Sequence, residues 1–291
     1  MSNRILATGA TGNVGSEVVK QLSAKGASVR ACCHTLSKAG GIRGPGVEIV
    51  EVDYDEPETV EAAFKGVERL FLLTPGWPGV ERTVEITKLL VEEAKKAMVQ
   101  HIVRLSALWA DAEAKVPPMR WHRQAEKIIE ESRIPYTFVR PADFMQTYPM
   151  SHGQTIKAQN AIYTGTGEGK IGFVDARDIA AVAVEALTGD GHEGKIYPTT
   201  GPEALSHNQV AKILSEVLGR KITHVNLSEE DVRKGIEEAG LPDWYLDAAI
   251  EASRSTREGR YSAVSATVEE VTGKKPRSFE QFARDYAEAF E

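Results

Sequence analysis

Three glycines near the start of the chain have the spacing of a turn that can bind phosphate. Gly9, Gly12 and Gly15 lie between a short apolar run, Ile5–Ala7, and a helical apolar pattern that ends at Gly26. Glycine lets backbone N–H groups approach a pyrophosphate, and the amino end of the following helix favours the anion. A purely structural turn is the alternative, but the strand–turn–helix context favours a dinucleotide site.

The next predicted strand lacks the acidic group that is typical of NAD sites. In those sites a carboxylate near the end of the second strand binds the ribose 2′-hydroxyl, whereas residues 18–47 contain no Asp or Glu. The basic residues of this stretch are Lys20, Lys25, Arg30, His34, Lys38 and Arg43. They would attract a 2′-phosphate, so we expect NADP as cofactor, with NADPH preferred over NADH. A solvated basic face is the alternative.

A histidine and a glutamate lie one turn apart in a helix predicted over residues 119–132. His122 and Glu126 stand at i and i+4, so their side chains share one helical face. One interpretation makes His122 a proton donor or a substrate-orienting group, with its charge stabilised by Glu126. The other is a structural contact between the two side chains. The sequence leaves both interpretations open.

Large side chains that could form a flat apolar pocket follow the predicted strands. Trp77 and Trp109 come after strand ends, and Trp121 adjoins His122. With Met145 and Tyr148 they could surround a planar substrate, because aromatic side chains stack on such molecules. Ordinary burial of large residues is the alternative.

These residues need a scaffold that brings strand ends together, and the sequence predicts one. Up to Pro141, strand and helix patterns alternate about six times, which is typical of an α/β fold with a doubly wound parallel sheet. The expected strands are 5–7, 27–33, 47–52, 70–73, 102–105 and 136–139, and the expected helices include 57–64, 80–98 and 119–132. In such sheets ligands bind outside the carboxyl ends of the strands.

The pattern changes after Pro141. Residues 142–169 are expected to be irregular, followed by a strand near 171–174 and a helix over 179–187. Ser206 and Gln209 form a capping box for a helix that ends at Gly219, and Ser228 caps another. We therefore divide the chain into a dinucleotide-binding core, residues 1–141, and a smaller mixed substrate-binding lobe, residues 142–291, interleaved with the core.

Composition argues against several classes of protein. The net charge of −7 argues against nucleic-acid binding, and no apolar run is long enough to span a membrane. Cys32 and Cys33 are the only cysteines, so neither a disulfide framework nor a structural metal site is expected. With no signal peptide apparent, we expect a cytoplasmic protein, a monomer or homodimer, that acts on a small molecule.

Two segments carry a resemblance to a known superfamily. Residues 8–15, Thr-Gly-Ala-Thr-Gly-Asn-Val-Gly, resemble the extended and atypical short-chain dehydrogenases/reductases, which have a Rossmann-type fold. His-x-x-x-Glu at 122–126, followed by Pro-Tyr-Thr-Phe-Val-Arg-Pro at 135–141, looks like the NmrA-like branch, which includes quinone oxidoreductase 2 and triphenylmethane reductase. The helix that carries His122 lacks the Tyr-x-x-x-Lys pair of other short-chain reductases.

The resemblance implies cofactor contacts by position. Those expected to hold the pyrophosphate are Gly9, Thr11, Gly12, Asn13 and Val14. Those expected at the 2′-phosphate and the adenine are His34, Lys38, Asp53 and Tyr54. Those expected around the nicotinamide and its ribose are Thr74, Pro75, Ser106, Pro141, Ala142 and Phe144.

The resemblance also implies an activity, an NAD(P)H-dependent reductase that transfers hydride to a small conjugated acceptor such as a quinone, dye, imine or activated alkene. Such acceptors need no strongly activated acid, so positioning can carry much of the rate. A non-catalytic NmrA-like redox sensor, which binds dinucleotide and a protein partner, is the alternative. A nucleotide-sugar epimerase is disfavoured because such enzymes need the missing tyrosine.

Overall fold

The computed structural model describes residues 4–76 and 79–291, and the chain divides into two compact units. The first contains residues 1–114, 118–141 and 176–198, and the second contains residues 115–117, 142–175 and 199–291. Most of the second unit follows Ala142 in the chain, and the division made from the sequence stays a prediction. Residues 176–198, which were expected within the lobe, belong to the first unit.

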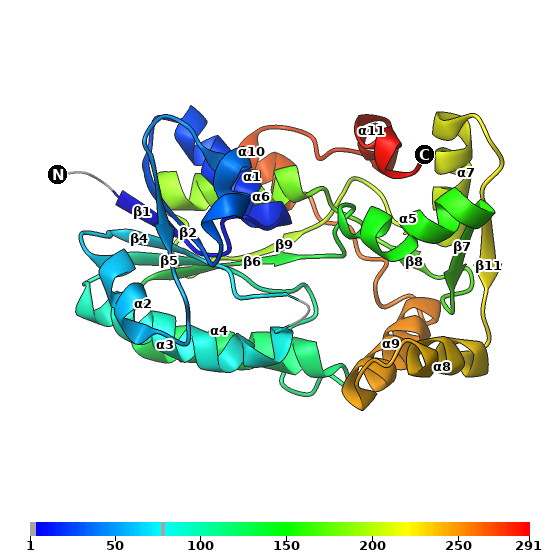
Figure 1. The fold of residues 1–291 in the computed structure, drawn as a ribbon, viewed down its shortest axis with the longest axis horizontal. Coiled ribbons are helices and arrows are strands. Elements are labelled where there is room, and N and C mark those ends of the chain that lie inside the picture. Colours follow the sequence, from blue (N-terminus) through cyan, green and yellow to red (C-terminus); the bar gives the residue numbers. More distant parts are fainter. Residues whose placement is uncertain (1–3, 77–78) are drawn as a thin grey trace. The chain divides into compact units, whose positions relative to one another are not determined.

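A seven-stranded sheet forms the centre of the first unit, in the order β3-β2-β1-β4-β5-β6-β9 (Figure 1). The strands are β1 (Arg4–Ala7), β2 (Ser28–Cys33), β3 (Val47–Glu51), β4 (Arg69–Leu72), β5 (His101–Leu105), β6 (Tyr136–Pro141) and β9 (Ile196–Thr199). Neighbours from β3 to β6 pair in parallel. The predicted doubly wound sheet is confirmed, and its order reverses between β1 and β4, the point at which such folds bind ligands.

Helices cover both faces of this sheet. On one face lie α1 (Asn13–Ala24) and α6 (Ala176–Thr188), and on the other α2 (Pro57–Phe64), α3 (Thr83–Lys96) and α4 (Pro117–Ser132) (Figure 1). The 3-10 helices η1 (Leu36–Ile42) and η2 (Val80–Arg82) lie in its loops. The apolar cluster beneath α2, α3 and α4 includes Leu6, Leu70, Leu72, Ile86, Leu90, Ile102, Ile129 and Phe138. Alternate strand residues reach this cluster because successive side chains point to opposite faces.

The second unit consists mainly of helices with two small sheets. Its helices are α5 (Thr147–Gln159), α7 (His207–Leu218), α8 (Glu229–Glu238), α9 (Asp243–Arg257), α10 (Thr267–Thr272), α11 (Phe279–Asp285) and η3 (Ala287–Ala289). Its paired strands are β7 (Ala161–Thr164) with β11 (Thr223–Asn226), and β8 (Lys170–Ile171) with β10 (Leu205–Ser206). The predicted capping box of α7 is present, since Ser206 Oγ accepts from the backbone N–H of Gln209 at 3.3 Å.

Helix α5 is the main element that the sequence analysis missed. Residues 142–169 were expected to be irregular, and Pro149 and Gly153 within α5 are poor helix formers. Pro149 is tolerated because it lies in the first turn, where its missing N–H costs no hydrogen bond. Burial of Tyr148 and Ile156 in the core of the second unit stabilises the helix that local propensity disfavours.

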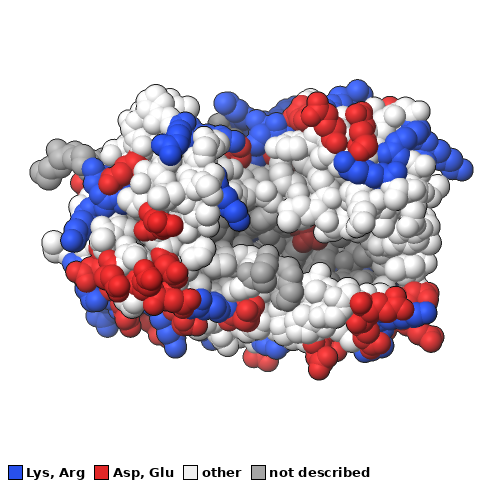
Figure 2. Space-filling view, in the orientation of Figure 1, with Lys and Arg blue, Asp and Glu red and all other residues white. Residues whose placement is uncertain are grey.

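The described residues contain no helix with the length and apolarity needed to cross a membrane. On the face drawn in Figure 2, acidic side chains gather over α2, and basic side chains are scattered around them.

Candidate functional site

The predicted glycine turn joins β1 to α1 and is packed too tightly for other residues. Gly9 has a φ of +62°, in the left-handed region, and a Cβ there would lie 2.9 Å from the side chain of Leu73. A Cβ at Gly15 would overlap the carbonyl oxygen of Gly9. Glycine at these two positions therefore lets the first turn of α1 press directly against the loop that follows β1.

The amino end of α1 is open to an anion. Its N-cap is Gly12, which has no side chain to satisfy the unpaired N–H groups of the first turn. Thr11, Gly12 and Asn13 are exposed, whereas Val14 is buried and can contribute only its backbone. These residues fit a pyrophosphate, because free N–H groups and the helix dipole both favour negative charge at this point.

Thr8, which the sequence analysis did not select, ties β1 to the loop after β4. Its hydroxyl donates to the carbonyl of Leu73 at 2.8 Å and accepts from the backbone N–H of the same residue at 2.8 Å. Thr74 and Pro75 follow directly, and Thr74 Oγ1 lies 3.3 Å from Thr83 Oγ1. The sequence feature that could have revealed this role of Thr8 is a hydroxyl residue directly before the first glycine of the turn. Its two hydrogen bonds fix the loop at which the sheet order reverses.

Basic side chains beyond the end of β2 remain the candidates for a 2′-phosphate. His34 and Lys38 are both exposed, and His34 Nδ1 lies 3.8 Å from the Asp53 carboxylate. Tyr54 is half-buried against the apolar cluster under α2, and its hydroxyl interacts with Thr8. The residues expected at the adenine end of the cofactor therefore follow the carboxyl ends of β2 and β3.

Three of the basic residues noted in this region are engaged elsewhere. Arg30 is only 6% exposed, and its guanidinium donates to Glu48 and to two backbone carbonyls at the end of α2. Lys20 and Lys25 form ion pairs with other side chains of the first unit. Fewer basic side chains are thus available to a 2′-phosphate than the sequence suggested. The two numbers differ because side-chain direction, which composition cannot reveal, decides which basic groups reach this site.

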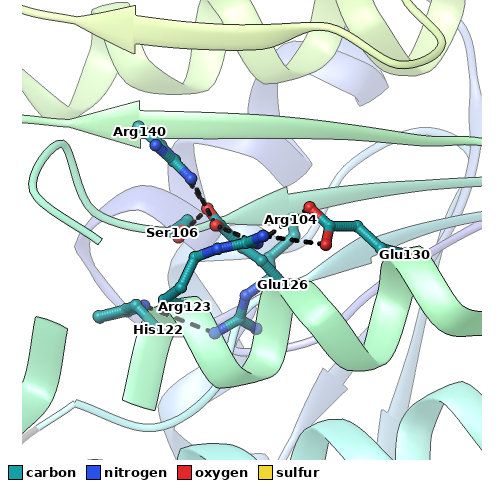
Figure 3. A network of polar contacts seen from close by, with 7 residues as sticks. All are labelled: Arg104, Ser106, His122, Arg123, Glu126, Glu130 and Arg140. Carbon is teal, nitrogen blue, oxygen red and sulfur yellow. Dashed lines mark hydrogen bonds and ion pairs between the residues drawn. The ribbon is translucent and has the colours of Figure 1, made fainter. Parts of the chain in front are cut away.

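Glu126 is the centre of a buried polar network at the ends of β5 and β6 (Figure 3). It is 0% exposed, accepts from Ser106 Oγ at 2.7 Å and pairs with Arg140 at 2.5 Å. Arg123 lies 3.2 Å from the same carboxylate and 2.9 Å from Glu130. Because Ser106 and Arg140 lie at the ends of β5 and β6, their contacts with Glu126 hold α4 against these two strands.

The polar contact of His122 is with Arg104 and not with Glu126 (Figure 3). Arg104 Nη2 lies 3.5 Å from His122 Nδ1, and Arg104 Nη1 lies 3.4 Å from Thr87 Oγ1. Burial and the positive charge of Arg104 lower the pKa of His122 to about 3. The expected stabilisation of a charged imidazole by Glu126 is therefore corrected. The lowered pKa favours the neutral imidazole at physiological pH, in which one ring nitrogen donates and the other accepts a hydrogen bond.

The candidate substrate residues are divided between the two units. Trp109 follows β5 and Trp121 lies in α4, and both are half-buried in the first unit. Met145 and Tyr148 lie in the core of the second unit, 1% and 3% exposed. The Tyr148 hydroxyl forms a hydrogen bond with His207 Nδ1 at 2.8 Å. The two tryptophans thus keep partly accessible surface, whereas the methionine and the tyrosine are packed.

The residues expected at the nicotinamide flank the division between the units in the chain. Pro141 ends β6 in the first unit, whereas Ala142 and Phe144 belong to the second. Ala142 is buried, and Phe144 is half-buried. Trp77 lies outside the described residues. Within the described residues, no group of His, Cys, Asp or Glu could hold a metal ion.

Known proteins resemble this chain over almost its whole length. A model of the NmrA-like family matches residues 1–283. An NAD(P)H azoreductase of Xenophilus azovorans is 37% identical over 98% of this chain and 99% of its own. The structure of a Citrobacter triphenylmethane reductase complexed with NADP(H) has a TM-score of 0.84 and 27% identity, covering 97% of this chain and 99% of that one. An Escherichia coli NADPH-dependent quinone oxidoreductase complexed with NADPH has a TM-score of 0.85 and 26% identity, with the same coverage.

Proposed function

The chain belongs to the NmrA-like family, and on that premise we propose that it is an NAD(P)H-dependent reductase of small conjugated acceptors such as quinones and dyes. One observation carries the proposal, the open amino end of α1 against a glycine turn at the point where the sheet order reverses. The relatives that reduce quinones and dyes, two of them solved in complex with NADP(H) or NADPH, support the same class.

Most of the residues that would hold the dinucleotide lie in the first unit. The backbone of Gly9–Val14 binds the pyrophosphate, His34 and Lys38 bind the 2′-phosphate, and Asp53 and Tyr54 flank the adenine. Thr74, Pro75 and Ser106 line the ribose of the nicotinamide. When bound, NADPH supplies the hydride.

The chain's own contribution to the reduction is positioning. Trp109 and Trp121, both half-buried, are the aromatic side chains that would contact a planar acceptor. His122, neutral at physiological pH, can donate a hydrogen bond to an oxygen or nitrogen of the acceptor. Holding the acceptor in line with the cofactor removes much of the entropic barrier, and the final proton can come from water because reduced quinones and dyes are stable anions or amines.

The proposal is tested by turnover and by cofactor choice. The purified protein is mixed with NADPH and a panel of quinones, azo dyes, triphenylmethane dyes and imines, and the loss of NADPH absorbance is followed. We expect turnover of at least one class, with NADPH binding tighter than NADH. Substitution of both His34 and Lys38 by Ala should weaken NADPH binding and leave NADH binding unchanged. Tight NADPH binding without any turnover would instead identify a dinucleotide sensor that acts on a protein partner.

A further inference from the structure

Arg104 is a buried cation that the proposed function does not explain. It lies on the central strand β5 and is 0% exposed. Within the described residues its guanidinium forms no ion pair, and its Nε has no hydrogen-bond partner. Moving a charge out of water costs free energy unless the charge is paired. We therefore look for a role of Arg104 other than stabilising the fold.

The surroundings of Arg104 direct it toward His122. Alternation along β5 places Arg104 on the face covered by α3 and α4, the face that also carries Ile102. On that side Thr87 of α3 accepts from Nη1 at 3.4 Å and donates its own proton to the carbonyl of Thr83 at 2.7 Å. The remaining arm, Nη2, lies 3.5 Å from His122 Nδ1. Thr87 therefore holds one arm of the guanidinium while the other faces the imidazole.

The chemistry of the two groups decides where the imidazole carries its proton. A guanidinium has only N–H donors and no acceptor, so Nδ1 of His122 must present its lone pair. The single proton of a neutral imidazole is then on Nε2. On the same helix Arg123 is paired with Glu126, and Arg120 donates to the carbonyl of Ala114 at 2.6 Å. Arg104 is thus the charged group that faces His122 from the sheet, and it opposes protonation of Nδ1.

We propose that Arg104 is a positioning residue that fixes His122 as a neutral imidazole protonated at Nε2, so that His122 donates a hydrogen bond to the acceptor as it receives the hydride. The part that concerns the acceptor rests on the proposed function. The tautomer of His122 does not depend on the proposed function, because it is a property of the protein without cofactor or acceptor.

The tautomer is measured by long-range ¹⁵N–¹H NMR of the histidine side chains of the intact chain, with His122→Gln to assign the signals. In the wild type we expect the Nε2–H pattern to persist between about pH 5 and pH 8. In Arg104→Met, which replaces the guanidinium by an apolar chain of similar length, the signals should become those of mixed tautomers. The titration midpoint should rise but stay below about 6.5, because burial, the larger cause of the lowered pKa, remains. Arg69→Met is the matched control, because Arg69 is on the neighbouring strand and donates to the carbonyl of Leu187; it should leave the His122 signals unchanged.

Kinetics test the second half of the proposal. Arg104→Met should lower kcat by about 10- to 100-fold, less than the loss of the donor itself, with unchanged NADPH affinity. If Arg104→Met fails to fold, Arg104→Gln serves in its place. A wild-type spectrum with the proton on Nδ1, or an unchanged spectrum in the Arg104 variant, overturns the proposal. An altered tautomer with unchanged kcat overturns its catalytic half. Failure of the proposed function is recognised separately, because the wild type would then turn over no acceptor while its tautomer stayed measurable.

Discussion

At the scale of single residues, the candidate site depends on which side chains face each other across the sheet and helix α4. His122 and Glu126 are neighbours on α4, yet the first contacts Arg104 and the second contacts Ser106 and Arg140. The two residues therefore have separate roles. His122 is the candidate for contact with the acceptor, and Glu126 stabilises the position of the helix.

His122→Phe should lower kcat by roughly 10²–10³-fold, the loss typical of removing one hydrogen-bond donor to a developing negative charge. NADPH affinity should not change, because the phosphates bind at the glycine turn. With the pKa of His122 lowered to about 3, the wild-type kcat should show no ionisation of this group between about pH 5 and pH 8. Steady-state kinetics across that range check both points. A variant with unchanged kcat and KM would remove His122 from the mechanism.

Glu126→Gln should destabilise the first unit by about 3–5 kcal/mol, because it removes a fully buried carboxylate and leaves the half-buried Arg140 without its counter-charge. Glu130→Gln is the matched control. It removes a carboxylate that contacts only Arg123 at the half-exposed end of the same network, and we expect a loss of at most about 1 kcal/mol. Urea unfolding at neutral pH measures both. Equal effects of the two substitutions would show that Glu126 is not the centre of the network.

At the scale of elements, the loop between β1 and α1 determines where an anion can bind. The helix begins at Gly12 without a side-chain cap, and its first turn touches the loop through Gly15. Thr8 fastens the same loop to the segment after β4. The predicted anion site therefore depends on β1, the glycine turn and α1 keeping their relative positions.

Gly15→Ala tests this arrangement, because the added methyl group would overlap the carbonyl oxygen of Gly9. We expect the helix to shift, with a stability loss of about 1–3 kcal/mol and at least a tenfold loss of NADPH affinity. Gly235→Ala is the matched control: Gly235 lies in α8 with open space where its Cβ would be, and the substitution should stabilise that helix by up to about 1 kcal/mol. Calorimetric titration with NADPH and thermal unfolding measure the two effects. Retention of full NADPH affinity in Gly15→Ala would argue against this binding site.

At the scale of the whole molecule, both units bury neutral histidines, and this links stability to pH. Burial lowers the pKa of His101 in the first unit to about 4 and that of His207 in the second to about 3. The unfolded chain, with histidine pKa values near 6.5, binds protons in acid that the folded chain does not. The stabilisation is therefore complete above about pH 6.5 and is lost as the pH falls through this value toward the folded-state values.

Each of these two buried histidines should contribute up to about 1.4 kcal/mol of lost stability per pH unit below about pH 6. Denaturant unfolding at several pH values between about 4.5 and 7.5 measures the slope. His207→Gln, which keeps a polar partner for the Tyr148 hydroxyl, should reduce it. An identical slope in wild type and variant would exclude His207 as a titrating group.

The sequence alone determined the class of fold and the family, and it predicted a place for the dinucleotide. Gly9, Gly12 and Gly15, the apolar strands and the Ser206 capping box are local features, so their spacing is enough to reveal them. The comparisons confirm the predicted family and agree with the predicted reductase class. The assignment of individual side chains to cofactor and substrate stays a prediction.

Tertiary structure alone decided the partners of the charged side chains. Spacing along α4 paired His122 with Glu126, but the sheet beneath brings Arg104 to one residue and Arg140 to the other. The tertiary structure also buries Arg30 beside Glu48. It stabilises α5 through the burial of Tyr148, although the local sequence of α5 disfavours a helix. The physical reason is the same in each case. A long side chain or a poor helix former takes its lowest free energy from groups that are distant in sequence, and only the folded chain brings those groups together.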